Sequence, residues 1–190
     1  MILELIHKNR SYRRFDKTES VSTKTLRDLI DLARYSPSAA NRQPLKYILS
    51  SDPKKNESIF QHLSWAGYLK DWPGPDVLER PSAYIIILGD TRITQNFGCD
   101  HGIAAQSILL GAAEKGLGGC MICSIKRDGL RKDLAIPEHF QILMVIALGK
   151  PAECIILEDI GPEGNIEYYR DPQDRHHVPK RKLDELIVAE

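Results

Sequence analysis

The sequence predicts a domain of the α+β class, with several helices packed on a buried sheet. Apolar residues recur at helical spacing from Leu26 to Ala33 and from Ile103 to Ala112, as in helices that turn one face toward a core. Two continuous apolar runs, residues 84–88 and 142–148, are typical of strands covered on both faces. Because such strands need helices to cover them, we expect one layered core.

Length and charge limit the classes of partner. The chain has 190 residues, enough for a full hydrophobic core in one domain, and its 26 basic residues balance 26 acidic ones. A net charge of zero creates no overall field for nucleic acid or an anionic membrane, so we expect neither as a partner. Since no segment has the length of a membrane span or the pattern of a secretory signal, we expect a cytoplasmic protein.

The first half of the chain carries clear boundary signals. Ser22 or Thr23 can cap a helix that runs to about Tyr35. Residues 45–50 then predict a strand, and residues 52–63 a turn followed by a short helix.

The second half continues in the same way. We expect a buried strand at residues 82–89, a helix from Asp100 to about Lys115, a short charged helix at 126–134 and a last core strand at 141–148. The helix from Asp100 is rich in Gly and Ala, which permits close helix packing.

A polar loop of unusual composition, Ser-Pro-Ser-Ala-Ala-Asn-Arg-Gln-Pro, fills residues 36–44. Its prolines fix φ near both ends, while Ser38, Asn41 and Gln43 can donate and accept hydrogen bonds. This mixture suits a planar heterocycle better than a metal or a nucleophile. A surface turn uses the same residue types, so the loop alone does not decide between the two interpretations.

A second polar motif lies near the start of the chain, where residues 10–14 hold three arginines and a serine. Guanidinium groups match the oxygens of a phosphate, so the motif predicts an anion site. The alternative is a solvated basic turn.

The four cysteines invite a metal or redox interpretation, because Cys120 and Cys123 have the spacing of zinc ligands and dithiol motifs. Cys99 and Cys154 are isolated, however, and no second close pair exists. We therefore expect buried free thiols. A thiol or metal protein built on Cys120 and Cys123 remains the alternative function of another class.

Two further segments leave alternatives open. The loop from Trp65 to Pro75, which carries both tryptophans, combines aromatic residues with Gly and Pro. It predicts either a lid over a flat substrate or a loop packed onto its own domain. From Pro151 to Pro179 the composition shifts to Glu, Asp, Gly, Pro and Tyr, as in an extended arm or a mobile tail, and we expect this arm to cover residues 151–190. We expect His176 and His177 on this arm to be surface imidazoles.

Together these motifs resemble the nitroreductase family, whose members bind FMN at the interface of a homodimer. One departure is Asn9, at a position where the family often has an arginine. The resemblance rests on Arg10-Ser11-x-Arg13, Ser36-Pro37-Ser38 with Asn41-x-Gln43-Pro44, Asp100 to Gln106, Gly116 to Gly119, Ile136-Pro137, Leu148 to Pro151 and the basic pair Lys180-Arg181.

The resemblance implies a single FMN-binding domain over residues 1–190, with a mixed, mainly antiparallel central sheet flanked by helices and an arm that interlocks the homodimer. It also implies ping-pong hydride transfer from NADH or NADPH to a nitroaromatic, a quinone or a similar small acceptor. Family members that dehalogenate, cleave flavin or desaturate are alternatives, as is an FMN-binding module without turnover.

The site residues follow from the same resemblance. Arg10 and Arg181 would bind the phosphate, Ser11 the ribityl-phosphate end, and Asn41 and Gln43 the polar edge of the ring. Arg13 would tune the flavin, and no catalytic side chain or metal is required. The full expected set is Arg10, Ser11, Arg13, Pro37, Ser38, Ala39, Asn41, Gln43, Gly118, Gly119 and Arg181.

Overall fold

Strand β5 (Phe140–Pro151) is the centre of the fold in the computed structural model, which describes residues 1–189. It pairs with β3 (Ala83–Asp90), with β4 (Gly118–Ile122) and, at its end, with β1 (Phe15–Asp16). Strand β2 (Leu45–Ser50) extends the sheet beyond β3. All these described pairings are antiparallel, which confirms the α+β class with a mainly antiparallel central sheet.

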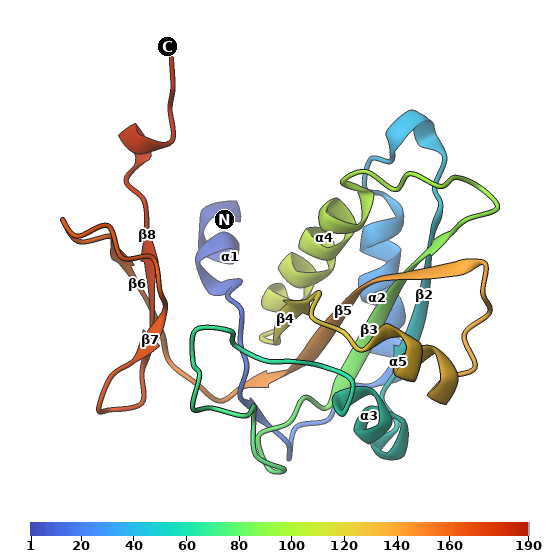
Figure 1. Cartoon of the computed structure of the whole chain (residues 1–190), viewed down its shortest axis with the longest axis horizontal. Coiled ribbons are helices and arrows are strands. Elements are labelled where there is room, and N and C mark those ends of the chain that lie inside the picture. Colours follow the sequence, from blue (N-terminus) through green and yellow to red (C-terminus); the bar gives the residue numbers. More distant parts are fainter. Residues whose placement is uncertain (190) are drawn as a thin grey trace.

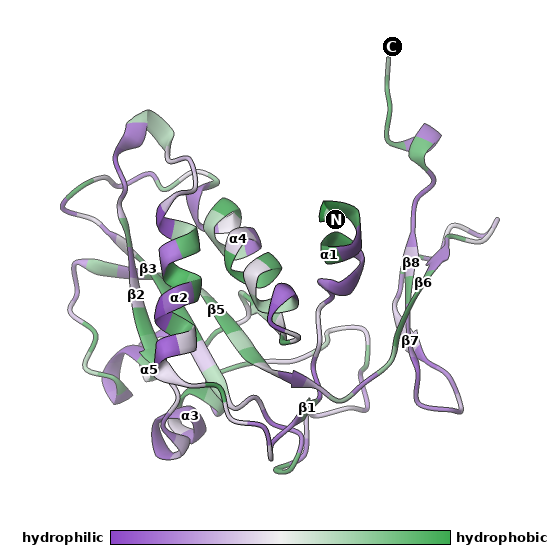
Figure 2. Cartoon of the chain, turned by 180° about the vertical axis from the view of Figure 1, so that it is seen from behind, coloured by the Kyte–Doolittle hydropathy of each residue, from purple (hydrophilic) through white to green (hydrophobic). Residues whose placement is uncertain are grey.

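Two pairs of helices cover the two faces of this sheet (Figure 1). Helices α2 (Thr23–Arg34) and α4 (Asp100–Glu114) pack on one face with Ile85 and Ile87. Helices α3 (Pro53–Phe60) and α5 (Arg127–Asp133) lie on the other face with Ile86. Successive strand residues point to opposite faces, and both faces of β3 are buried. Residues 83–88 of this strand are therefore continuously apolar, before Gly89 and Asp90 (Figure 2).

Helix boundaries agree with the capping signals. The Ser22 hydroxyl accepts a hydrogen bond from the Thr25 amide at 3.0 Å at the start of α2, and Asp52 caps α3 through the Lys55 amide at 2.8 Å. Helix α3 ends at Phe60 rather than near Leu63, because the amides of the next turn bond three residues back instead of four.

The arm folds as a second, smaller sheet. Strand β8 (His176–Lys180) lies between β6 (Ile155–Asp159), to which it is parallel, and β7 (Tyr169–Arg170), to which it is antiparallel. A 3-10 turn, η2 (Leu183–Glu185), follows. Figure 1 shows this sheet beyond the first helix, α1 (Ile2–Lys8), and apart from the central sheet.

The two histidines of β8 differ from expectation. His176 is completely buried, so the prediction of a surface imidazole is wrong for it. The His177 imidazole is partly buried between two carboxylates: its Nδ1 lies 2.8 Å from Glu158 and its Nε2 lies 3.1 Å from Asp171. The composition of the arm gave no signal for either environment, because both arise from pairing between strands that are distant in sequence.

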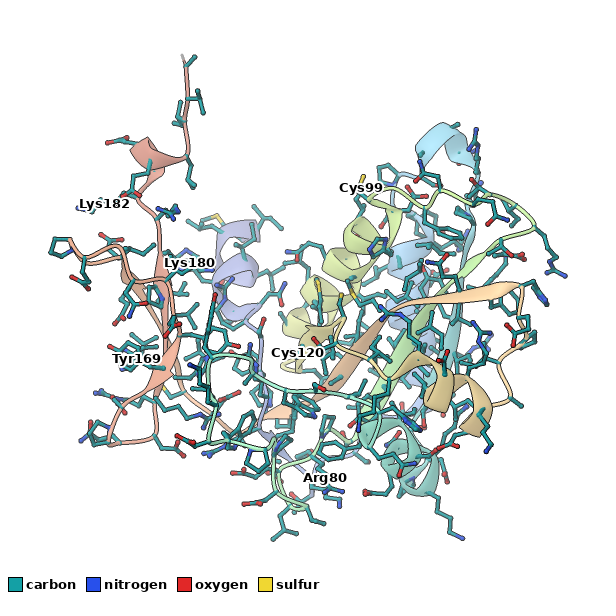
Figure 3. All side chains as sticks on the ribbon, in the orientation of Figure 1. Arg80, Cys99, Cys120, Tyr169, Lys180 and Lys182 are labelled. Atoms are coloured by element: carbon teal, nitrogen blue, oxygen red, sulfur yellow. The ribbon has the colours of Figure 1, made fainter. Side chains whose placement is uncertain are left out.

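The thiols also differ in part from expectation. Cys120, on β4, is buried as predicted, but Cys99, Cys123 and Cys154 are exposed because they lie just outside regular elements. Figure 3 labels Cys99 and Cys120. Residues 1–189 contain no group of three or more His, Cys, Asp or Glu side chains placed to hold a metal. None of the helices in the described chain is long and apolar enough to span a membrane.

Candidate functional site

Three cationic side chains line a cavity of about 380 Å³ between the N-terminal segment, α4 and the arm. We call it the cationic cavity. It is lined by Asn9, Arg10, Ser11, Arg13, Gln106, Leu109, Met121, Ile155, Tyr168, His176, Val178 and Lys180.

The chemistry of this lining favours an anion. Arg10, Arg13 and Lys180 contribute positive charge, and no carboxylate of residues 1–189 lines the cavity. Arg10 donates to the Ile6 carbonyl at 2.7 Å, but its buried Nε has no partner among the described residues. A guanidinium group with an unused donor, in a cavity without negative charge, fits a phosphate group.

Arg13 is held from several directions. Its backbone amide donates to the buried carboxylate of Glu153. Its guanidinium lies 3.3 Å from the Ser11 carbonyl, 3.2 Å from Nε2 of His176 and 4.7 Å from the ring centroid of Tyr168. The side chain therefore has a defined position, set largely by the arm.

Arg13 also lines a second, smaller cavity of about 190 Å³, which we call the Trp65 cavity. Arg13 and Met121 line both cavities and so form the wall between them. The other residues of the Trp65 cavity are Ser64, Trp65, Ala66, Gly67, Cys120, Ile122, Cys123 and Ser124.

The aromatic loop packs onto its own chain. Trp65 lies 5.8 Å from Phe60 between ring centroids. The Trp72 ring has guanidinium groups at 5.9 Å, from Arg14, and at 5.0 Å, from Arg170 of the arm. These contacts favour the packed loop over the lid, because they fix both tryptophans on neighbouring elements.

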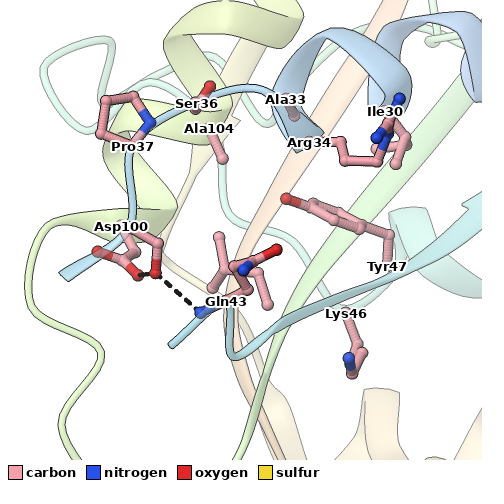
Figure 4. Close-up of a pocket in the computed structure, with 12 residues that line it drawn as sticks. Ile30, Ala33, Arg34, Ser36, Pro37, Gln43, Lys46, Tyr47, Asp100 and Ala104 are labelled. Carbon is pink, nitrogen blue, oxygen red and sulfur yellow. Dashed lines mark hydrogen bonds between the residues drawn. The ribbon is translucent and has the colours of Figure 1, made fainter. Parts of the chain in front are cut away.

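A third cavity, of about 310 Å³, lies against the Ser36–Pro44 loop. We call it the loop cavity. Figure 4 shows its lining and two of its hydrogen bonds, from the Ser38 hydroxyl to Asp100 and from the Gln43 amide to Ser38. Asp100 is buried and accepts hydrogen bonds from the Ser38 hydroxyl at 2.6 Å and the Ala39 amide at 3.1 Å. Burial, with a smaller contribution from Asp100, raises the pKa of Tyr47 in this cavity to about 12.

The loop is strained where it meets the cavity. Ala40, Asn41 and Gln43 have φ of 50°, 52° and 50°, a region that costs energy for residues other than glycine. Gln43 Nε2 donates to the Asn41 side chain at 3.0 Å, and the Gln43 amide donates to Ser38 at 3.0 Å. Strain held by a local hydrogen-bond network is common in ligand-binding loops.

Helix α4 separates the two sets of polar residues. Asp100 and Ala104 line the loop cavity, whereas Gln106 and Leu109 line the cationic cavity. At about 100° per residue these pairs project from opposite faces of the helix. One chain therefore presents two separate polar sites rather than one continuous site.

Comparison with known proteins identifies the family. A sequence model described as the nitroreductase family matches residues 6–150. This chain belongs to the nitroreductase family. One member, a Methanothermobacter thermautotrophicus protein provisionally named an NADH dehydrogenase/NAD(P)H nitroreductase, is 31% identical over 159 residues, covering 80% of this chain and 78% of the relative.

Solved nitroreductase structures share the fold. A nitroreductase family protein from Clostridium novyi NT is 25% identical, with a TM-score of 0.66 over 80% of this chain and 85% of that one. A Clostridium difficile R20291 protein, titled an FMN-dependent nitroreductase, is 22% identical, with a TM-score of 0.62 over 80% of this chain and 88% of that one. The second likeness shows the fold alone.

The expected nitroreductase site residues fall into three groups. The cationic cavity brings together Arg10, Ser11 and Arg13. The loop cavity brings together Pro37, Ser38 and Gln43, with the Ala39 amide bonded beside it and Asn41 bonded to Gln43. The remaining expected residues, Gly118, Gly119 and Arg181, are absent from the lining of both cavities.

Both glycines have a packing reason to be there. A Cβ on Gly118 would lie 2.4 Å from the Tyr12 ring, and one on Gly119 would lie 2.6 Å from the Ala147 carbonyl oxygen. Gly119 also accepts a hydrogen bond from the Tyr12 amide at 3.0 Å. They allow the cationic N-terminal segment to lie directly against β4.

Lys180, labelled in Figure 3, lines the cationic cavity. Arg181 instead is exposed, 3.4 Å from Glu185. On strand β8, His176, Val178 and Lys180 alternate and so share the face toward the cavity. Tyr168 and His176 were not expected from the sequence, and no local pattern marks them: Tyr168 lies just before β7, and residues 176–180, His-His-Val-Pro-Lys, do not alternate between apolar and polar.

Proposed function

We propose that this nitroreductase-family chain is an FMN-dependent oxidoreductase that carries hydride from NADH or NADPH to a small electron-poor acceptor, such as a nitroaromatic or a quinone. The observation that supports it most is the cationic cavity, in which Arg10, Arg13 and Lys180 meet without a carboxylate of the described chain. A cofactor with one phosphate and a flat ring fits a site with a strongly cationic end.

The cationic cavity and the loop cavity, which we treat as two half-sites of one shared site, support a homodimeric arrangement. Because α4 stands between the cationic cavity and the loop cavity, a ligand in the first does not reach the second within one chain. In the proposed dimer, the Ser36–Pro44 loop of the partner subunit completes the cationic cavity. The strained backbone at Ala40 and its neighbours would then present polar groups of the loop to the ligand of the partner subunit.

Each residue has a defined role in this proposal. Arg10 and Lys180, in place of the expected Arg181, hold the phosphate, and Ser11 contacts the adjoining ribityl end. Arg13 places a positive charge beside the ring. Gln43 of the partner subunit, fixed by its bond to Asn41, meets the polar edge of the ring.

A bound flavin itself supplies the hydride chemistry, so the chain needs no acid or base of its own. Two consequences follow for the protein. It must bind the phosphate firmly enough to retain the cofactor, and it must leave one side of the ring open to the donor and the acceptor in turn.

The first test is a visible spectrum of the purified protein with FMN, before and after anaerobic addition of NADPH and then NADH. We expect bound flavin bands that bleach with at least one donor and return with a quinone. Bound flavin that fails to bleach would favour an FMN-binding module or a specialised family member. Absence of flavin binding would refute the proposal.

The second test asks whether the site is shared between subunits. Arg10→Ala and Ala39→Trp each damage a different half-site, and we expect each variant alone to retain little FMN. Unfolding and refolding the two together makes mixed dimers with one intact site, so about a quarter of the wild-type FMN should return. A site contained within one chain would recover none.

A further inference from the structure

The completely buried imidazole of His176 lies on the wall of the candidate site. Its Nε2 is 3.2 Å from Nη1 of Arg13, and its ring is 5.2 Å from that of Tyr168 between centroids. Arg170 and His177 are the other charged or titratable groups that act on it. A fully buried histidine against an arginine is unusual and requires an explanation.

The groups available decide which residue donates and which accepts in the contact between Arg13 and His176. A guanidinium group only donates, so Nε2 of His176 must accept and the imidazole must be neutral, with its proton on Nδ1. The environment agrees, because burial, followed by the charges of Arg13 and Arg170, lowers the pKa of His176 to about 4. At neutral pH His176 is therefore a fixed hydrogen-bond acceptor.

This acceptor completes a cradle for one guanidinium group. Arg13 also donates to the Ser11 carbonyl at 3.3 Å and lies over the Tyr168 ring at 4.7 Å. Two of the three contacts come from the arm. They hold Arg13 at the wall that separates the cationic cavity from the Trp65 cavity.

We propose that His176 is a positioning residue for Arg13: it fixes the guanidinium at this wall, and the fixed charge makes the site bind reduced, anionic FMN more tightly than oxidised FMN. The inference rests on the proposed function. Without the acceptor, Arg13 gains rotational freedom and its charge is no longer held beside the ring, so discrimination between the two flavin states weakens.

The test compares two substitutions that differ in one property. His176→Phe keeps a buried ring but removes the acceptor, whereas His176→Gln keeps an acceptor. From the reduction midpoints of bound and free FMN, we expect His176→Phe to lower the preference for reduced FMN about tenfold, the effect of one charge-assisted hydrogen bond. His176→Gln should stay within about twofold of wild type.

Repeating the His176 substitution in Arg13→Ala protein distinguishes an effect through Arg13 from a general structural effect of losing His176. If His176 acts through Arg13, His176→Phe has no further effect on the midpoint in Arg13→Ala protein. Equal effects in both backgrounds would overturn the positioning role. A wild-type midpoint in His176→Phe would overturn it too, while leaving the proposed function intact, whereas wild-type protein that binds no FMN would refute the proposed function itself.

A measurement without flavin covers the case in which His176→Phe does not fold. The guanidinium N–H signals of Arg13, assigned by ¹⁵N NMR, should show slow rotation and slow solvent exchange at neutral pH in both the wild type and His176→Gln. Below pH 4 the protonated imidazole can no longer accept a hydrogen bond, so rotation should become fast in the wild type and stay slow in His176→Gln. Fast exchange of the wild-type Arg13 signals at neutral pH would overturn the inference.

Discussion

The central sheet and the arm sheet are stabilised in different ways. Every residue of β3 is buried, and apolar side chains from helices on both faces cover it. The arm sheet has one fully buried side chain among its strands, His176, and is held by charged contacts such as Arg170–Glu153 at 2.9 Å. Burial of apolar surface thus fixes the body, whereas a few polar contacts fix the arm.

This difference separates stability from binding. The cationic cavity takes Tyr168, His176, Val178 and Lys180 from the arm. A change in the arm is therefore expected to weaken the proposed binding without unfolding the body, whereas a change in the central sheet is expected to destabilise the whole chain. The predictions below test this division.

The largest effect is expected in the central sheet. Ile86 on β3 is fully buried, and Ile86→Ala should lower the free energy of unfolding by about 4 kcal/mol through lost burial and the cavity left behind. Ile166→Ala on the arm, where the side chain is 48% exposed, is the matched control and should cost less than about 1 kcal/mol. Urea unfolding at fixed protomer concentration measures both, and similar losses would contradict the division.

The next effect falls at the junction between arm and body. Glu153 is 2% exposed and accepts hydrogen bonds from Arg170 at 2.9 Å and from the Arg14 amide at 3.2 Å, as well as from the Arg13 amide. Glu153→Ala leaves these donors unpaired, so we expect a local loss of about 3 kcal/mol.

Hydrogen exchange should place this loss in β6 and β8, with the β3 amides unchanged. Glu185→Ala removes an exposed carboxylate, 3.4 Å from Arg181, and is the control, with an expected effect under about 1 kcal/mol. If Glu153→Ala exposed β3 as well, arm and body would form one cooperative unit.

Acidification should act on the arm through His176. Its pKa, about 4 in the folded protein, lies below the unfolded value near 6.5, so the unfolded chain binds more protons between these limits. The contribution of His176 to the free energy of unfolding is therefore complete above pH 6.5. It is lost as pH falls toward 4, by at most about 3 kcal/mol. His176→Gln should flatten this loss in urea midpoints measured from pH 7 to 4.

The neighbouring His177 should respond in the opposite sense. Hydrogen bonds to Glu158 and Asp171 raise its pKa, so its contribution is present below pH 6.5 and is lost as pH rises through the raised folded value. His177→Asn should therefore lower arm protection more at pH 6 than at pH 8. A larger loss at pH 8 would show that the two carboxylates do not act on a charged imidazole.

The sequence anticipated the body well because its signals are local. Apolar periodicity located α2 and α4, the continuous run at 84–88 located β3, and Ser22 marked a helix start. Each of these signals lies within the element that it predicts.

The arm could not be predicted in the same way. Strand β6 pairs in parallel with β8, so that Ile155 lies opposite His176, and no local pattern encodes that pairing. Whether Lys180 or Arg181 lines the cavity depends on which face of β8 is turned toward it. That face can be assigned only when the bounds and pairing of β8 are known. Likewise, the bond between Ser38 and Asp100 joins two motifs that the sequence shows separately.

The smallest predicted effect concerns strain in the Ser36–Pro44 loop. Ala40 has φ of 50°, and Ala40→Gly should raise the free energy of unfolding by about 0.5 to 1 kcal/mol by relieving it. Ala135, with φ of 49° outside the site, is the control, and its replacement by glycine should stabilise the chain equally. Only Ala40→Gly should alter FMN affinity. If the glycine substitution at Ala135 altered FMN affinity equally, the strain in the Ser36–Pro44 loop would have no specific role in the site.

The composition of the cationic cavity also has a consequence for synthesis. Its walls come from residues 9–13, from residues 106–121 and from residues 155–180. During translation the arginines emerge first, yet their neighbours follow only when almost the whole chain has left the ribosome. A nascent chain can assemble much of the central sheet earlier, but the proposed phosphate site is complete only at the end. Truncated products are therefore expected to fold in part without a complete site.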